Sequence, residues 1–211
     1  MTMAGLDAYL KELSSPQSET LQWLEKQTHL RTNHARMLSG SVVGTLLKNI
    51  SLMISPSRIL ELGTFTGYSS ICLSAGLGES GVIDTIELND ELEDLIRSGF
   101  NRAGISDKVN LIFGDAKDII PTLDHIYDLV YIDANKREYS DYFTLVIDKV
   151  RKGGYIIADN VLWDGKVYDG KQYNDAQTKG ILAFNQLVRD DSRVENVILP
   201  IRDGLNLIRI K

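Results

Sequence analysis

The pattern of apolar and polar positions divides the chain into a helical first quarter and an alternating remainder. Before residue 55, apolar residues recur at helical spacing, and the pattern predicts helices over residues 6–13, 19–28 and 42–54. Pro56 marks the end of the third helix, since proline cannot continue it. We find no stretch approaching the roughly 18 apolar residues needed to cross a bilayer. We therefore expect these helices to belong to a globular domain.

From residue 58 onward, short apolar runs alternate with amphipathic segments, which is typical of a parallel sheet covered on both faces. The predicted strands are 58–62, 81–87, 109–113, 127–132, 154–159, 194–199 and 205–210. The predicted helices between them are 69–77, 90–103, 116–123, 139–150 and 176–188. Asp203-Gly204 is a hairpin signal between the last two strands. The pattern predicts a Rossmann-like, doubly wound α/β sheet of seven strands, mostly parallel, with one antiparallel strand near the C-terminus.

The composition changes this picture in three ways. A length of 211 residues suits one domain, residues 1–211, with N-terminal helices over 1–55 and an α/β core over 56–211. Cys72 is the single cysteine, and the N-terminus lacks the features of a signal peptide, so we expect a reducing, cytoplasmic location. A net charge of -6 weighs against a nucleic-acid partner, although a local basic patch would still be possible.

The first predicted strand ends in a glycine turn that is suited to a ligand. Gly63 and Gly67 allow close backbone approach just before a helix. Glu87 ends the second strand, where doubly wound folds place an acidic residue on ribose hydroxyls. Asp115 follows the third strand. Each residue also has a plainer interpretation, as a strand–helix turn, a solvated carboxylate and a helix N-cap.

Oxygen-bearing side chains follow the fourth and fifth strands. Asp133 ends one strand, while Asp159 and Asn160 end the next, and the topology places these ends side by side. Two carboxylates and an amide are hard donors, so they favour Mg²⁺, Mn²⁺ or Ca²⁺ over Zn²⁺. Helix capping and turn formation explain any one of the three. Their convergence beside a ligand site favours a divalent cation.

Lys136 lies three residues after Asp133 and is predicted to point into the same mouth. A lysine beside a bound cation can act as a general base, and a metal-bound phenolic hydroxyl ionises more easily. The alternative is a surface lysine paired with Glu138 or Asp141. The functional interpretation predicts in-line transfer to an acceptor oxygen, with alignment and charge placement as the main catalytic contributions.

Together these residues resemble the cation-dependent class I S-adenosylmethionine O-methyltransferases, which include the caffeoyl-CoA and catechol enzymes. The resemblance is closest to the bacterial members of this family. The resemblance covers the chain from about Arg36 to the C-terminus. The segments that carry it are Met37–Gly40, Leu60–Ser69, Ile132–Lys136, Ala158–Trp163, Ala183–Asn185 and Asp203–Leu205.

The resemblance implies a role for each matching residue. The cofactor S-adenosylmethionine would be bound by Met37, Ser39, Glu61, Gly63, Phe65, Tyr68, Ser69, Glu87, Asp115, Ala116 and Asp133. The divalent cation, Mg²⁺ first, would be held by Asp133, Asp159 and Asn160. Lys136 and Asp133 would be catalytic, and Lys136, Asn160 and Trp163 would meet the acceptor. The family also implies homodimers, with the N-terminal helices helping to cover the acceptor site.

Alternatives remain at this point. The acceptor is expected to be a small catechol-like or phenolic molecule, with no membrane or nucleic-acid partner. A tRNA hydroxyuridine O-methyltransferase would use the same chemistry. A Rossmann-type oxidoreductase is disfavoured by the G-x-x-x-G spacing, and a non-catalytic adenosine-binding module would not need Asp133 and Lys136. The sequence departs from the family at Ser41 and Val43, where many relatives have a longer polar residue, and at Asn135.

Overall fold

The computed structural model describes residues 3–211, apart from the side chains of Met3, Ala4 and Asp7. It contains a seven-stranded sheet in the order β3-β2-β1-β4-β5-β7-β6. The strands are β1 (Arg58–Leu62), β2 (Val82–Glu87), β3 (Val109–Phe113), β4 (Tyr127–Ile132), β5 (Val150–Asp159), β6 (Val194–Leu199) and β7 (Leu205–Ile210). The helices are α1 (Met3–Leu13), α2 (Glu19–Arg31), α3 (Gly40–Ile54), α4 (Tyr68–Ser74), α5 (Glu93–Ala103), α6 (Ala116–Ile119), α7 (Tyr139–Val146) and α8 (Ala176–Asp190).

The strand directions confirm the predicted sheet. β1 to β5 pair in parallel, whereas β7 is antiparallel to both of its neighbours. The Asp203-Gly204 turn therefore joins a hairpin, as its residues indicate. β7 enters between β5 and β6, so this turn lies beside the carboxyl end of β5.

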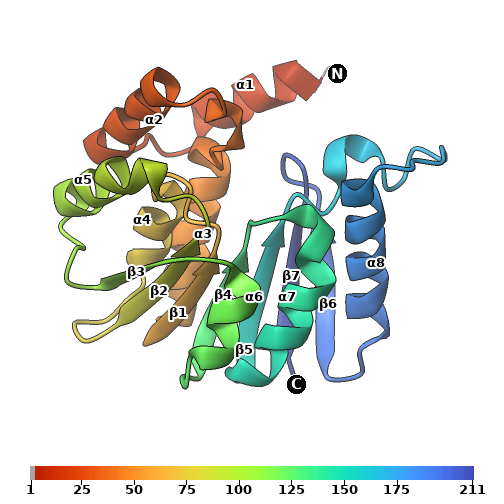
Figure 1. The fold of residues 1–211 in the computed structure, drawn as a ribbon. Coiled ribbons are helices and arrows are strands. Elements are labelled where there is room, and N and C mark those ends of the chain that lie inside the picture. Colours follow the sequence, from red (N-terminus) through yellow and green to blue (C-terminus); the bar gives the residue numbers. More distant parts are fainter. Residues whose placement is uncertain (1–2) are drawn as a thin grey trace.

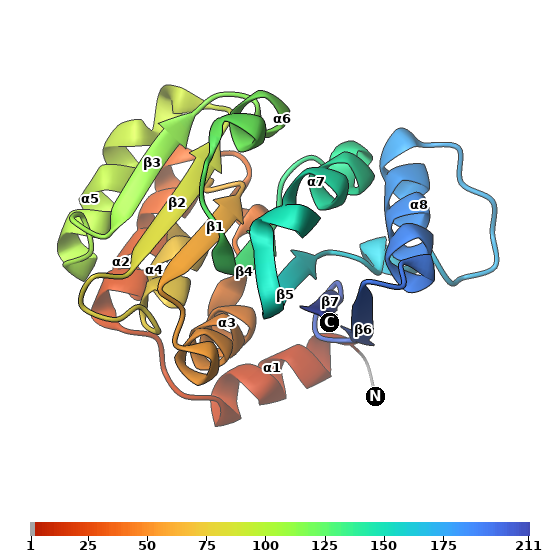
Figure 2. The ribbon, with the colours of Figure 1, turned by 90° about the horizontal axis from the view of Figure 1, so that it is seen from below.

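Two helical layers cover the sheet, as Figures 1 and 2 show from two directions. α2 to α5 pack on one face around buried residues that include Leu24, Leu47 and Leu73. α6, α7 and α8 pack on the other face, where Phe143 and Phe184 meet edge to face with ring centroids 6.1 Å apart. Figure 1 shows α1 and α2 at the end of the sheet where the parallel strands terminate. The N-terminal helices thus lie above the edge that carries the candidate site.

One segment corrects the expectation that no stretch is apolar enough for a membrane. Among residues 3–211, Ala35–Ile54 is long and apolar enough by length and composition to cross one. Within the fold this segment contains α3, whose residues Val43, Leu47 and Ile50 are buried in the same core as α4. The hydroxyl of Ser51 donates to the carbonyl of Leu73, which fixes α3 against α4. The apolar character serves domain packing.

Two predicted boundaries were wrong around β5. The predicted helix 139–150 ends at Val146 and is followed by a 3₁₀ turn, Ile147–Lys149. β5 then begins at Val150, four residues before the predicted start. Val150 pairs with Tyr127 across a register shift, so the glycines after it lie inside the strand rather than before it. A local pattern could not show this, because the pairing comes from β4.

Candidate active site

Neighbouring strand ends bring the predicted oxygen cluster together. Ile132 of β4 pairs with Ala158 of β5, so Asp133 and Asp159 follow at adjacent positions on one edge of the sheet. Asp159 is 5 % exposed, and Asn160 next to it has a left-handed backbone with φ of 59°. Left-handed backbone is uncommon outside glycine but is tolerated by asparagine, which fits a residue turned sharply at a site. The prediction that these residues converge is confirmed by the geometry.

Lys136 points into this cluster. Its Nζ donates to Oδ1 of Asp133 at 2.5 Å and to the hydroxyl of Tyr139 at 2.8 Å. The side chains of Lys136 and Asp133 are 11 % and 19 % exposed. Because Lys136 pairs with Asp133, the alternative pairing with Glu138 or Asp141 is wrong. Glu138 instead pairs with Lys117. The ammonium is therefore held within the cluster rather than in solvent.

The carboxylate of Asp159 is held by two hydrogen bonds. The hydroxyl of Tyr131 donates to Oδ2 at 2.9 Å, and the backbone N–H of Asn160 donates to Oδ1 at 2.7 Å. Burial, and then the negative charge of Asp133, raise the pKa of Asp159 to about 6, while Lys136 opposes the shift. A buried carboxylate next to a partly buried one makes this edge favourable for a cation.

Two tyrosines that the sequence analysis missed organise the cluster. Tyr131 and Tyr139 are fully buried. Burial and the nearby carboxylates raise the pKa of both hydroxyls well above the usual value, so both remain protonated donors at neutral pH. The hydroxyl of Tyr139 donates to the carbonyl oxygen of Asp159 at 3.0 Å. It thereby links the base candidate Lys136 to the backbone after β5.

Asp203 is a further residue of the site that was treated only as a turn signal. Its Oδ1 accepts from the backbone N–H of Asp164 at 2.6 Å, and its own carbonyl accepts from the N–H of Leu162 at 2.8 Å. Burial raises its pKa, and Lys136 and the Asn160 amide partly offset this effect. The β6–β7 turn therefore holds the loop after β5 in place.

The donor set limits what this edge can bind. Within the described part of the chain, no group of three or more His, Cys, Asp or Glu side chains lies close enough to hold a metal ion. A cation here would have the carboxylates of Asp133 and Asp159, with the Asn160 amide as the third protein ligand. Such a set of hard oxygens, with few charges, suits Mg²⁺ that keeps several water ligands. The residues fit a hard divalent cation.

Glu61 provides an acceptor for a cationic group. It is fully buried, and its Oε2 accepts from the hydroxyls of Ser70 and, at 2.6 Å, Thr85. No donor among the described residues lies within hydrogen-bond distance of its Oε1, although the Ser69 hydroxyl is near enough to the carboxylate to oppose the rise in its pKa. Burial raises the pKa of Glu61 to about 7, and Asp133 adds to the shift. A buried acceptor without a donor fits the ammonium of an amino-acid moiety.

The glycine turn and Glu87 make one unit. Gly63 has φ of +95°, and a Cβ placed there would lie 2.3 Å from the carbonyl oxygen of Asp133, so this position requires glycine. The carboxylate of Glu87 accepts from the backbone N–H of Phe65 at 2.7 Å and of Asn89 at 2.9 Å. Phe65 itself is left-handed, with φ of 51°. The turn therefore fixes the Glu87 carboxylate at the end of β2, where its remaining lone pairs can accept hydrogen bonds from a ligand.

The other residues predicted to bind the cofactor lie around the same edge. Asp115 caps α6, because its Oδ1 accepts from the N–H of Lys117 at 2.8 Å, and Ala116 after it is buried. Ser39 is buried near the hydroxyl of Tyr131, and Ser69 is buried beside Glu61. Two others differ in exposure. Met37 is 56 % exposed, whereas Tyr68 is buried against Gly44 and Cys72.

Trp163, which was predicted to meet the acceptor, follows the end of β5 in the chain. It is partly buried against the core on the α6–α8 side, with a left-handed backbone (φ of 47°). Tyr168 is 68 % exposed, and Tyr173 bonds to Asp169 within the loop. The structure brings Trp163 close to the end of β5.

Comparison with known proteins shows the class of enzyme to which this chain belongs. Residues 11–211 match the O-methyltransferase family, and the chain belongs to that family. The O-methyltransferase TomG from Streptomyces achromogenes, solved in complex with S-adenosylmethionine, superposes with a TM-score of 0.90 at 30 % identity, covering 98 % of this chain and 96 % of that one.

Two curated relatives narrow the type. A catechol O-methyltransferase of Niastella koreensis is 32 % identical over 80 % of this chain and 80 % of its own length. A probable caffeoyl-CoA O-methyltransferase of Dictyostelium discoideum is 29 % identical over 93 % of this chain and 86 % of its own. The protein is an S-adenosylmethionine-dependent O-methyltransferase of the caffeoyl-CoA and catechol type. This result excludes the oxidoreductase and the non-catalytic binding module.

Proposed function

We propose that this enzyme methylates a phenolic or catechol-like hydroxyl of a small molecule and requires a divalent cation. The observation that carries the proposal is the convergence of Asp133, Lys136, Asp159 and Asn160 at the ends of β4 and β5. A neutral acceptor alone would not need two carboxylates and an ammonium buried side by side, because burying charges without a purpose is costly.

The cation would be bound by Asp133, Asp159 and Asn160. When bound, it would polarise the acceptor hydroxyl as a Lewis acid. The hydrogen bonds from the Tyr131 hydroxyl and from the backbone N–H of Asn160 both orient the carboxylate of Asp159. These contacts keep Asp159 in place before a cation arrives, which reduces the cost of ordering it.

Lys136 acts as the general base in this proposal. In its uncharged form, Nζ takes the proton of the acceptor hydroxyl. The methyl group then passes to the resulting oxyanion as its bond to the donor sulfur breaks, which leaves S-adenosylhomocysteine. Asp133 and Tyr139 hold Nζ from two sides, which fixes its position relative to the acceptor oxygen. A base fixed in this way contributes both proton transfer and alignment.

The methyl donor would bind along the edge formed by β1, β2 and β3. Glu61 would accept from its ammonium, Glu87 from its ribose hydroxyls, and the loop at Asp115 and Ala116 would border the adenine. Met37, Ser39, Tyr68 and Ser69 would enclose the methionine part, and the backbone of Gly63 and Phe65 would pass close beneath it. The buried free acceptor of Glu61 and the backbone-held carboxylate of Glu87 support this placement.

The proposal also covers the domain organisation, the oligomeric state and the location of the enzyme. Residues 1–211 form one domain, with the N-terminal helices of residues 1–55 over the acceptor side of the 56–211 core, and Trp163 beside the acceptor. The enzyme acts as a homodimer in the cytoplasm, without a nucleic-acid or membrane partner. The net charge of -6 supports the absence of a nucleic-acid partner, and the single, buried cysteine Cys72 supports the reducing location.

A direct test compares acceptors with a labelled methyl donor: catechols, acyl-CoA phenols and hydroxylated tRNA. Activity on a catechol-like acceptor should vanish in EDTA, return with Mg²⁺, and fall severely in Asp133→Ala. Full activity in chelator would overturn the cation role. Methylation confined to the tRNA would overturn the small-molecule acceptor and support the hydroxyuridine enzyme instead.

A further inference from the structure

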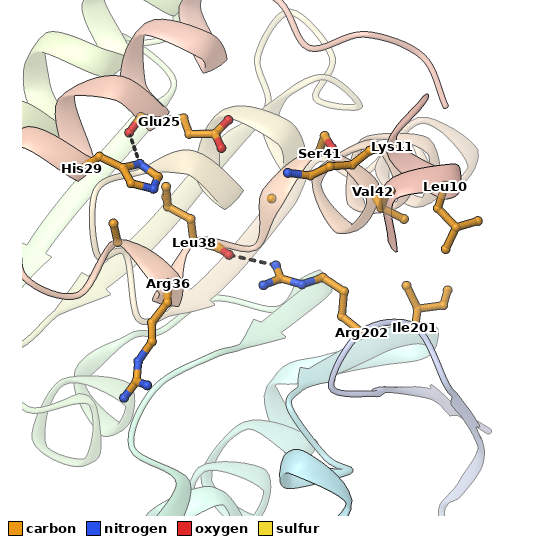
Figure 3. A pocket seen from close by; sticks show the side chains of 13 residues that line it. Leu10, Lys11, Glu25, His29, Arg36, Leu38, Ser41, Val42, Ile201 and Arg202 are labelled. Carbon is orange, nitrogen blue, oxygen red and sulfur yellow. Dashed lines mark hydrogen bonds between the residues drawn. The ribbon is translucent and has the colours of Figure 1, made fainter. Parts of the chain in front are cut away.

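A cavity lies beside the segment that follows α2 and carries Met37 and Ser39. It has a volume of about 320 Å³ and opens between α1, α2, the start of α3 and the β6–β7 turn. Asp133, Lys136, Asp159, Asn160 and Trp163 are not among its lining residues, so it is distinct from the catalytic edge. Figure 3 shows the side chains that enclose it.

The charge of this cavity is opposite to that of the chain. Three cationic side chains line it, Lys11, Arg36 and Arg202, against the single carboxylate of Glu25, whereas the whole chain carries a net charge of -6. Lys11 and Arg202 direct their cationic ends toward the same space, while the guanidinium of Arg36 turns away (Figure 3). Such a local positive field in an acidic protein attracts small anions.

Arg202 is fixed in position by the backbone. Its Nη1 donates to the carbonyl of Leu38 at 2.9 Å and to the carbonyl of Ser39, across about 160 residues of chain. Within the described part of the chain it forms no ion pair, and no hydrogen bond of Nε or Nη2 is recorded. A guanidinium anchored through one nitrogen can present the others to a carboxylate or phosphate with little loss of entropy.

The remaining walls suit an organic ligand rather than a bare ion. Leu10, Leu38, Val42 and Ile201 provide an apolar surface. His29 adds a ring whose Nδ1 lies 2.8 Å from the carbonyl of Glu25. A volume near 300 Å³, with apolar walls and a few placed polar groups, is typical of a small-molecule site.

We propose that this cavity, walled by Lys11, Arg202, His29 and the apolar residues Leu38 and Ile201, binds a small organic anion with an aromatic or aliphatic body. The anionic group, a carboxylate or a phosphate monoester, lies between Lys11 and Arg202, and the body packs on Leu38 and Ile201. The guanidinium that binds the anion also donates to the carbonyl of Ser39, and it thereby links the anion to the segment that carries Met37 and Ser39.

Calorimetric titration with phenyl phosphate tests the proposal, with benzyl alcohol as the neutral compound of similar size. Both titrations are made with the whole chain saturated with S-adenosylhomocysteine, which fills the cofactor site. Phenyl phosphate should bind, more weakly as salt rises, and benzyl alcohol should bind at least about tenfold more weakly. Equal affinity for the two compounds, or no binding of phenyl phosphate, would overturn the proposal.

Two variants locate the binding. Lys11→Gln, on the exposed face of α1, should weaken phenyl phosphate binding several-fold without touching the Arg202 anchor, and adding Arg202→Gln should bring the loss to about tenfold or more. Lys179→Gln on α8 is the matched control and should bind as the wild type. Wild-type affinity in Lys11→Gln and in the double variant, with unchanged circular dichroism, would show that the anion binds elsewhere.

Discussion

The ammonium of Lys136 lies 2.5 Å from Oδ1 of Asp133, and both side chains are mostly buried. Both residues follow the end of β4, and the hydroxyl of Tyr139, the first residue of α7, accepts a second hydrogen bond from Lys136. The ion pair thus lies where the hydroxyl of the methyl acceptor is expected to bind. Its chemistry is the first matter to test.

Replacing Lys136 with alanine should lower kcat by about 10²–10⁴-fold, because a positioned base contributes that much to proton transfer. The affinity for the cofactor should change little, since Lys136 is not among the residues proposed to bind it. The measurement is kcat against pH with a catechol-like acceptor. An unchanged rate across pH would remove Lys136 as the base, and Lys179→Ala is the control lysine.

Tyr131→Phe removes the donor to Oδ2 of Asp159 and leaves the ring in place. A residue that orients a metal ligand typically changes affinity by roughly 10–100-fold, so the Mg²⁺ concentration at half-maximal activity should rise by that factor. The maximal rate at saturating Mg²⁺ should be largely recovered. Tyr155→Phe, four residues before Asp159 in β5, is the matched control. Equal Mg²⁺ requirements for the two variants would contradict the role of Tyr131.

Asp203→Asn keeps the size of the side chain but removes the charge that faces Lys136 and the Asn160 amide. Hydrogen bonds to charged groups contribute about 1.5–3 kcal/mol, so kcat/KM for the acceptor should fall by roughly tenfold or more. The fall should appear mainly as a higher KM, because the amide oxygen accepts from the backbone N–H of Asp164 more weakly than the carboxylate does, and this bond helps to hold the loop after β5. Steady-state kinetics with Asp107→Asn as the exposed control check this, and a wild-type KM would refute it.

How much of this could be predicted from the sequence depends on where each contact originates. Asp133, Asp159 and Asn160 were predictable because each ends an apolar strand, and parallel strands end at one edge. Tyr131 and Tyr139 were counted as apolar positions, and periodicity does not reveal where a hydroxyl points. Asp203 reaches the site only because β7 enters between β5 and β6, which is a choice of tertiary pairing.

Glu61 makes stability depend on pH. Its pKa is about 7 in the folded chain against an ordinary value of 4.5, so ionisation of Glu61 is penalised in the fold. The penalty is absent below pH 4.5, grows as the pH rises, and is complete above about 7, where it amounts to about 3 kcal/mol. Glu61→Gln should therefore melt higher than the wild type at pH 8 and similarly at pH 5. Calorimetry with Glu79→Gln as control checks this.

The same carboxyl should couple cofactor affinity to pH. If the cofactor ammonium binds the ionised form, affinity for S-adenosylhomocysteine should improve by about tenfold from pH 6 to pH 8 in the wild type. In Glu61→Gln it should be weaker and nearly independent of pH over that range. Isothermal titration at both pH values decides the point. A variant that keeps the full pH dependence would place the titrating group elsewhere.

Gly63→Ala tests the close approach of β1 to β4. The new Cβ would lie 2.3 Å from the carbonyl oxygen of Asp133, and φ of +95° is strained for any L residue. Strain of this kind costs about 1–3 kcal/mol before the clash, so the melting temperature should fall by at least about 4 °C. Gly78→Ala, where nothing lies within 4 Å of the added Cβ, should change it little. Because the displaced atom belongs to Asp133, activity at 25 °C should fall more than the folded fraction does. A variant that loses stability without excess loss of activity would separate the glycine turn from the position of Asp133.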